Sequence, residues 1–365
     1  MATSMCPSNV SNELSSRQKS DDQVFNPARL KLARQRLGLS LTKVADQSGV
    51  SLRSLTNYEN DNSPPNEENL LKLAQTLAVP RGFFARESAD QVPVEAASFR
   101  KLSKTTALKR DAVLAAASLA IEFFILIEAR FKLPSPDIPS LDKLSPEQAA
   151  ELVRRQWNLG DRPVSNMVHL LESRGVRVAA INHEYRDIDA FCFWRDSTPY
   201  VFLNTSKSAE RQRFDAAHEL GHLVLHADAN MDPSLSKERE AEANRFGASF
   251  LMPQSAVLAQ SMRGASIDRI LAARSYWKVS AMAMTHRLHE LRLLSDWQYR
   301  TACVTLSDNG YRSSEPGGTI PETSQLLKKV MFGSGKLSVR DAARELDLDL
   351  SDVTHFVHGL VPVAA

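Results

Sequence analysis

The chain has few cysteines and almost no net charge. Its 365 residues include only 3 cysteines, which stand far apart at Cys6, Cys192 and Cys303 without a C-x-x-C pair. This pattern argues against a disulfide framework and against a thiolate zinc site. Because the formal net charge is only +2, any attraction to nucleic acid must come from a local basic patch.

Signals for a membrane span and for export are also missing. The most apolar stretch, residues 114–127, contains Glu122 and is shorter than the roughly 20 residues that a span needs. The N-terminus is polar and rich in Ser and Asn, without the apolar core of a secretory signal. We therefore expect a disordered tail at 1–25, a buried helix at 114–127, a cytoplasmic location and no membrane partner.

Helical periodicity fills the first part of the chain. Within residues 26–88, four short helical patterns follow one another. Ser40, Ser51 and Asn66 stand at N-cap positions, and Gly38 and Gly49 stand where helices stop. These signals predict a compact all-α domain at 26–88, followed by a linker and helical connector at 89–144.

The pattern changes in the second part of the chain. Three short segments rich in β-branched or aromatic residues predict strands: VRVAAIN at 176–182, DAFCFW at 189–194 and YVFLN at 200–204. Two long helices are predicted after them, at 208–227 and from about residue 233, so residues 145–295 are expected to form an α+β domain with a small sheet. The whole chain is then α+β and mostly helical, with a C-terminal helical segment at 296–365 whose role the pattern leaves open.

The stretch FDAAHELGHLVLHAD, residues 214–228, indicates a metal site. His218 and His222 are four residues apart, so both rings project from one helix face toward a single ion. Glu219 stands beside them, where it can act on a water at that ion. A merely solvated face would carry Lys, Glu and Gln and would not explain the H-E-x-x-H order.

A third ligand has three candidates. His226 lies about 12 Å from His218 along an unbroken helix, too far for a shared zinc. Asp228 has a suitable spacing, but the chain would have to turn at a glycine where Leu225 stands. On the next helix, Glu242 lies beside the apolar residues expected to pack inward, whereas Glu240 is expected to point elsewhere. We therefore favour Glu242.

Two imidazoles and one carboxylate leave a position for water, which is typical of catalytic zinc. Glu219 is then the general base of peptide-bond hydrolysis. The oxyanion partner stays open, with His226, Tyr185 and Arg211 as candidates by position. Asp215 either orients a ligand imidazole or only complements the helix dipole.

The residues around this helix closely resemble the ImmA/IrrE metallopeptidases. The resemblance rests on RQRFDAAHELGHLVLH and EAEANRFGASFLMP, and on RQWNLGDRPV, HLLESRGVRV, DAFCFW and VFLN in the same order. It implies a zincin-like domain at 145–295 with one Zn²⁺ per chain. By the same resemblance the ligands are His218, His222 and Glu242, and the base is Glu219.

The first domain contains ADQSGVSLRSLTNYEN, which reads as helix, glycine turn and helix, and residues 29–79 resemble the Xre/Cro-type helix-turn-helix. The resemblance implies that 52–60 is the recognition helix of a homodimer on a double-stranded operator. Arg53 is expected to contact a guanine and Asn57 an adenine, while Arg34 pairs internally with Glu59. The DNA-binding set is then Ser51, Leu52, Arg53, Thr56 and Asn57.

The domain order resembles Xre-family regulators fused to an ImmA/IrrE peptidase. This resemblance implies a transcriptional regulator that binds an operator and cleaves a partner repressor or antitoxin. One alternative is a regulator whose zincin domain senses a ligand or metal without proteolysis. Another is an antitoxin-like repressor whose 296–365 segment binds a partner protein. The presence of Glu219 favours catalysis, because a sensor needs no general base.

Overall fold

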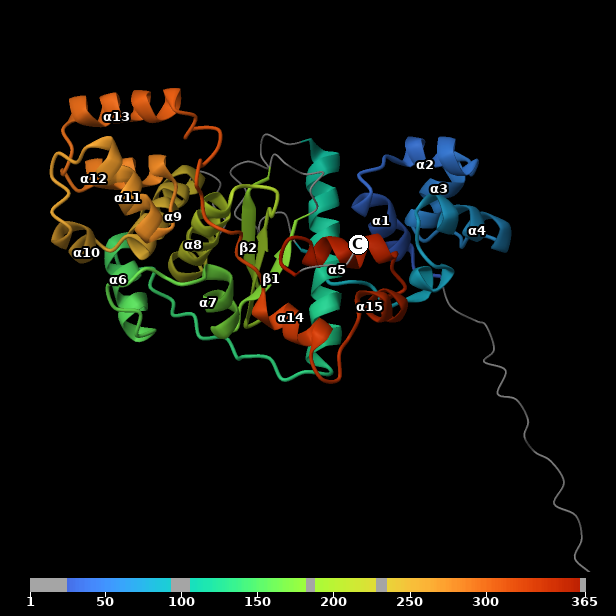
Figure 1. Ribbon diagram of the computed structural model, residues 1–365. Helices are drawn as coiled ribbons and strands as arrows, with labels where there is room; N and C mark the ends of the chain where they lie inside the picture. The colour runs from blue at the N-terminus through green and yellow to red at the C-terminus, as the bar shows by residue number, and fades with distance from the viewer. Residues whose placement is uncertain (1–24, 93–105, 182–187, 228–234, 362–365) are drawn as a thin grey trace, which may run out of the picture.

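The structure is a computed structural model that describes residues 25–92, 106–181, 188–227 and 235–361. Helices dominate it, and a three-stranded sheet lies near its middle (Figure 1). The predicted α+β class with mostly helical content is therefore confirmed. The tail predicted at 1–25 falls, except for Phe25, outside the described residues.

Short helices form the N-terminal part. Their bounds are α1 Pro27–Arg36, α2 Leu41–Ser48, α3 Leu52–Glu59, α4 Glu67–Thr76 and the 3-10 helix η1 Arg81–Ala85. The predicted N-caps are confirmed, because the side chains of Ser40, Ser51 and Asn66 each accept a hydrogen bond from a backbone N–H three residues later. Gly49 ends α2 with a φ of 70°, a left-handed conformation that costs glycine little.

A long apolar helix, α5 Ala107–Glu128, follows and packs against α1. Its Glu122 forms an ion pair with Arg29 of α1, in which Arg29 Nη1 lies 3.1 Å from Glu122 Oε2. Within the described ranges, no helix combines the length and the apolar character needed to cross a membrane. Most side chains of residues 114–127 are buried in this helix, so the prediction of a buried helix there is confirmed.

The sheet forms at the three predicted segments. Its strands are β1 Arg177–Ala180, β2 Ala190–Arg195 and β3 Thr198–Leu203, in the order β1-β3-β2, with β3 parallel to β1 and antiparallel to β2. The pleat places Phe191 and Cys192 on opposite faces. The aromatic face packs on α5, where the rings of Phe124 and Tyr200 are 6.0 Å apart. The other face carries the helix that contains the histidines.

Helices surround the other side of the sheet. They are α6 Pro146–Gln156, α7 Met167–Ser173, α8 Ala209–Leu225, α9 Ser236–Leu251, α10 Gln254–Ala259, α11 Ile267–Trp277, α12 Ala281–Glu290 and α13 Asp296–Asp308. Helices α8 and α9 approach closely at two glycines. A Cβ added to Gly247 would lie 3.2 Å from His218 N, and one added to Gly221 would lie 3.1 Å from Phe246 Cβ. The absence of these side chains allows the two helices to touch.

The C-terminal segment joins the two ends of the molecule. After α13 the chain runs back toward the N-terminal helices (Figure 1) and forms α14 Gln325–Phe332, α15 Val339–Leu346 and α16 Leu350–Val357. Glu322, which precedes α14, pairs with the buried Arg213 of α8. Asp352 of α16 pairs with Arg36 of α1 at 2.7 Å. The segment is therefore packed against both the N-terminal helices and the α+β part.

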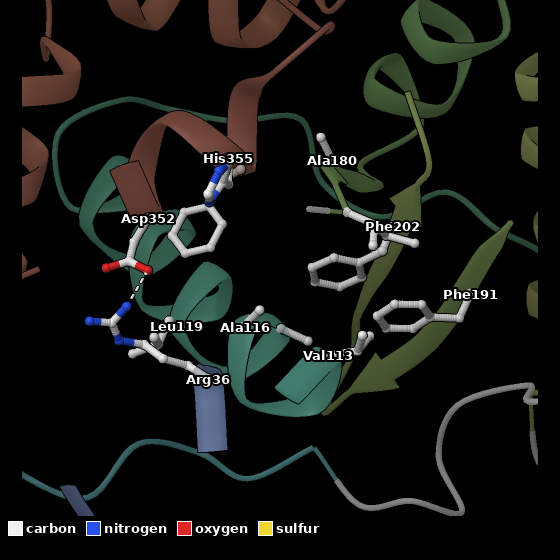
Figure 2. Close-up of a pocket in the computed structure, with 12 residues that line it drawn as sticks. Arg36, Val113, Ala116, Leu119, Ala180, Phe191, Phe202, Asp352 and His355 are labelled. Atoms are coloured by element: carbon white, nitrogen blue, oxygen red, sulfur yellow. Dashed lines mark hydrogen bonds and ion pairs between the residues drawn. The ribbon is translucent and has the colours of Figure 1, made fainter. Parts of the chain in front are cut away.

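A small cavity of about 30 Å³ lies where these parts meet (Figure 2). Phe191 and Phe202 of the sheet and apolar residues of α5 form most of its lining. Arg36 and Asp352 form a polar edge, beside His355. The volume is enough for about two water molecules, so α1, α5, α16 and the sheet are closely packed here.

Candidate metal centre and DNA interface

Helices α8 and α9 bring three possible ligands together. His218 and His222 lie one turn apart on α8, and Glu240 on α9 faces them. Their ligand atoms all lie within 4.8 Å of one another. Within the described residues, this is the group of His, Cys and acidic side chains whose geometry suits a metal ion.

The distances between these atoms match a tetrahedral site. The two Nε2 atoms of His218 and His222 are 3.1 Å apart. The Glu240 carboxylate oxygens lie 3.6 Å from His218 Nε2 and 3.4 Å from His222 Nε2. Zinc bonds of about 2.1 Å in tetrahedral geometry place neighbouring ligand atoms roughly 3.4 Å apart. The group therefore has the donor set and the spacing of a zinc site.

The structure does not place Glu242 in this group. Glu242 Oε2 instead lies 2.9 Å from His226 Nε2, and Glu240, which the sequence argument set aside, takes the place beside the two histidines. The reason is the rotation of α9 about its axis. Ala243 and Gly247 contact α8, and Glu240 lies three and seven residues before them, on the same face. Glu242 lies on another side of the helix.

Glu219 is buried beside the ligands, with only 3% of its surface exposed. Among the described residues its Oε2 atom has no hydrogen-bond partner. Burial raises the pKa of this carboxyl well above its ordinary value, and the nearby Glu240 carboxylate raises it further. A divalent cation at the group would favour the ionised carboxylate again. This unpartnered atom is therefore consistent with a base that acts on a water at an ion.

The Nδ1 atoms of the two histidines, which face away from the group, contact different partners. His218 Nδ1 lies 3.1 Å from Asn244 Oδ1, and His222 Nδ1 lies 3.0 Å from His226 Nδ1. Burial lowers the pKa of His218 to about 3, so its ring is neutral, as a metal ligand must be. Asn244 was not predicted from the sequence, although it follows Glu240 by four residues and so shares its face.

Two other residues proposed from the sequence, Arg211 and Asp215, lie one turn apart in the N-terminal half of α8. Arg211 pairs with Asp189 at 2.8 Å and with Asp215 at 3.0 Å. The first pair joins α8 to the residue that precedes β2, and the second lies within α8. Tyr185 and Asp228 lie outside the described residues. No described contact assigns Arg211 or His226 to an oxyanion, so these roles stay predictions.

A pocket of about 290 Å³ adjoins the centre through Asn244. Its apolar lining comes from Phe214 of α8, Ala248 of α9, Met252 and Ala283 of α12. Its polar lining comes from Asn244, Arg245, His286 and Glu290.

The helix-turn-helix consists of α2 and α3. Arg34 Nε and Nη2 donate to the Glu59 carboxylate at 2.6 and 2.9 Å, so the predicted internal pair is confirmed. Helix α1 faces α5, whereas α2, α3 and α4 lie on the side away from it (Figure 1). The contact with the rest of the chain therefore leaves the outer side of this region open.

The proposed DNA-binding residues differ in exposure. Leu52 and Arg53 are exposed at the start of α3, and Thr56 and Asn57 are half-buried. The hydroxyl of Thr56 donates to the Leu52 carbonyl at 2.9 Å, and that of Ser51 accepts from Ser54 N at 3.1 Å. Arg53 is therefore the exposed charged group of this set that can reach outward to a base or a phosphate.

Comparison with known families agrees with this two-part organisation. Residues 171–289 match the M78 peptidase family, described as the IrrE N-terminal-like domain. Residues 30–84 match a helix-turn-helix family. The search of curated proteins finds no match for the chain. The chain thus contains a helix-turn-helix domain of the kind found in DNA-binding regulators and a metallopeptidase-type domain.

Proposed function

We propose that this chain, with its helix-turn-helix domain and its IrrE N-terminal-like domain, is a transcriptional regulator that also acts as a zinc-dependent endopeptidase. Its substrate is a partner repressor or antitoxin protein. It binds a double-stranded operator as a homodimer and holds one zinc ion per chain. Proteolysis of the partner would then relieve the repression of transcription.

The observation that carries this proposal is the geometry of His218, His222 and Glu240. Their facing ligand atoms are 3.1 to 3.6 Å apart, and both imidazoles and the carboxylate are donors that zinc accepts. Three protein ligands leave one position open, as catalytic sites do and closed structural sites do not. When bound, zinc supplies a Lewis acid and lowers the pKa of a coordinated water toward about 7.

Glu219 supplies the proton transfer. Its buried Oε2 has no partner among the described residues, so it is available to accept a proton from the attacking water and to deliver it to the leaving amine. A domain that only sensed a metal would gain nothing from a buried carboxyl without a partner, which is costly to keep ionised. The pocket beside Asn244 is suited to hold a substrate side chain next to the centre.

DNA binding is supported by the position of α3. Leu52 and Arg53 are exposed at its N-terminus, the part of a recognition helix that meets base edges in the major groove. The pair of Arg34 with Glu59 stabilises the fold of this domain, so Arg34 is not available for DNA.

The test uses the full-length protein and a matched set of variants. Metal analysis of the purified chain should give one zinc per chain. Incubation with the repressor encoded by a neighbouring gene should then yield discrete fragments that a chelator prevents. The Glu219→Gln variant should keep its zinc and lose cleavage, while His222→Ala should lose both.

Each outcome separates the candidate functions. Cleavage by Glu219→Gln at the wild-type rate would contradict the assignment of the base. Stoichiometric zinc without chelator-sensitive cleavage of any candidate partner would favour a regulator that senses a ligand or metal. Absence of zinc would favour an antitoxin-like repressor.

A further inference from the structure

A chain of contacts leads from the metal centre to the outer side of α9. His222 Nε2 faces the other ligand atoms, and its Nδ1 lies 3.0 Å from His226 Nδ1. His226 Nε2 then lies 2.9 Å from Glu242 Oε2. The exposed fraction of the side chains rises along this path, from 6% at His222 to 12% at His226 and 31% at Glu242.

The distances determine which nitrogen of each ring carries a proton. An ionised carboxylate only accepts hydrogen bonds, so His226 Nε2 must donate to Glu242. In a neutral ring the other nitrogen, His226 Nδ1, is then an acceptor. It can accept only from a protonated His222 Nδ1, which leaves a lone pair on His222 Nε2. That lone pair points to the place where the ion is proposed to bind.

We propose that His226 and Glu242 are positioning residues that hold His222 in the tautomer and the ring orientation of a metal ligand. The inference rests on the metal site of the proposed function. A hydrogen bond from the non-coordinating nitrogen of a ligand histidine fixes the ring and increases the basicity of the coordinating nitrogen. Here the fixing acceptor is a second histidine, which is itself oriented by an ionised glutamate.

The two ligand histidines are therefore supported unequally. His218 donates to the neutral amide oxygen of Asn244, whereas the support of His222 ends at a charged carboxylate. Loss of the outer pair should thus weaken zinc binding without removing any ligand. The expected loss for a residue that orients a ligand is about 10- to 100-fold in affinity.

The experiment measures zinc affinity by competition with a chromogenic chelator. His226→Phe should bind zinc about 10- to 100-fold more weakly than the wild type. His226→Asn keeps an acceptor oxygen near the position of Nδ1 and should recover part of that loss. Glu242→Gln should show a smaller loss, because an acceptor oxygen stays while the charge is removed. Glu238→Gln, an exposed acid one turn earlier on α9, is the matched control and should bind as the wild type does.

Two further readouts separate positioning from folding. Metal-free His226→Phe should melt within a few degrees of the metal-free wild type, and Co²⁺ bound to it should give an altered visible spectrum, which reports a changed ligand geometry. Wild-type zinc affinity in both His226→Phe and Glu242→Gln would overturn the positioning role alone. Zinc binding by the wild type without cleavage would overturn only the proposed function, and absence of zinc binding would overturn both.

Discussion

The close contact of α8 with α9 gives a sharp prediction for Gly247→Ala. The added Cβ would lie 3.2 Å from His218 N and 3.4 Å from both His218 Cα and Ala217 C. Carbon atoms pack most favourably at about 3.5 to 4.0 Å. The atoms it meets belong to the backbone of α8 and cannot rotate away. The two helices must therefore separate by a few tenths of an ångström.

The size of the effect follows from two opposing contributions. Alanine is more favourable than glycine inside a helix by about 1 kcal/mol. Overpacking a close contact costs about 1 to 3 kcal/mol. The net destabilisation is then about 0 to 2 kcal/mol, and each 1 kcal/mol lowers the melting temperature of a domain of this size by roughly 2 to 4 °C.

Zinc binding should be affected as well. Helix α9 carries the ligand Glu240 and also Asn244, which contacts the ring of His218. Displacement of α9 therefore moves Glu240 away from the two histidines and Asn244 away from His218. Zinc binding would then have to restore the close contact against the overpacking cost of about 1 to 3 kcal/mol, which corresponds to an affinity loss of about 5- to 150-fold.

The assays are thermal unfolding of the metal-free protein and zinc competition. Ala241→Gly, at an exposed position of the same helix, measures the glycine-to-alanine difference without the contact. The free energy of unfolding gained by Gly247→Ala should be smaller than the alanine–glycine difference that this control gives. If Gly247→Ala gains the full amount and binds zinc as the wild type does, the helix crossing does not position the site.

Three other substitutions test separate parts of the structure. Glu240→Ala should lower zinc affinity, measured by chelator competition, by more than about 100-fold, which is the upper range for a residue that only orients a ligand. The control Glu238→Ala should keep the zinc affinity of the wild type. Arg53→Ala should weaken binding to an operator selected from random duplexes by about 1 to 3 kcal/mol, measured by fluorescence anisotropy at fixed salt; an unchanged affinity would remove Arg53 from the interface. Glu322→Gln leaves Arg213 buried without its charged partner and should destabilise the protein by about 3 to 5 kcal/mol in thermal unfolding. An unchanged melting temperature would refute a stabilising role for this ion pair.

Features determined by neighbouring residues could be predicted from the sequence. The caps at Ser40, Ser51 and Asn66 depend on a side chain and an N–H three residues later. The strands depend on short β-branched and aromatic segments, and the pairing of His218 with His222 depends on the pitch of one helix. Each of these requires only local geometry.

Features that depend on distant contacts could not be predicted in this way. The ion pairs of Arg213 with Glu322 and of Arg36 with Asp352 join residues far apart in the chain. Many acids could partner each arginine, and the sequence contains no local signal that selects one. The packing of the C-terminal segment against both ends of the molecule follows from such pairs.

The choice between Glu240 and Glu242 lies between these two cases. It depends on the rotation of α9 against α8. This rotation is a tertiary property, but the small residues on each helix indicate it in the sequence. Small residues stand four apart on both helices, Ala217 and Gly221 on α8 and Ala243 and Gly247 on α9. Such residues mark where two helix backbones touch, and this line on α9 contains Glu240, three residues before Ala243. The prediction from the sequence oriented α9 by Ala243 together with the bulky Phe246 and Phe250, and Phe246 meets α8 at Gly221. Orienting a ligand-bearing helix by its small residues, and not by its large ones, would have selected Glu240 from the sequence.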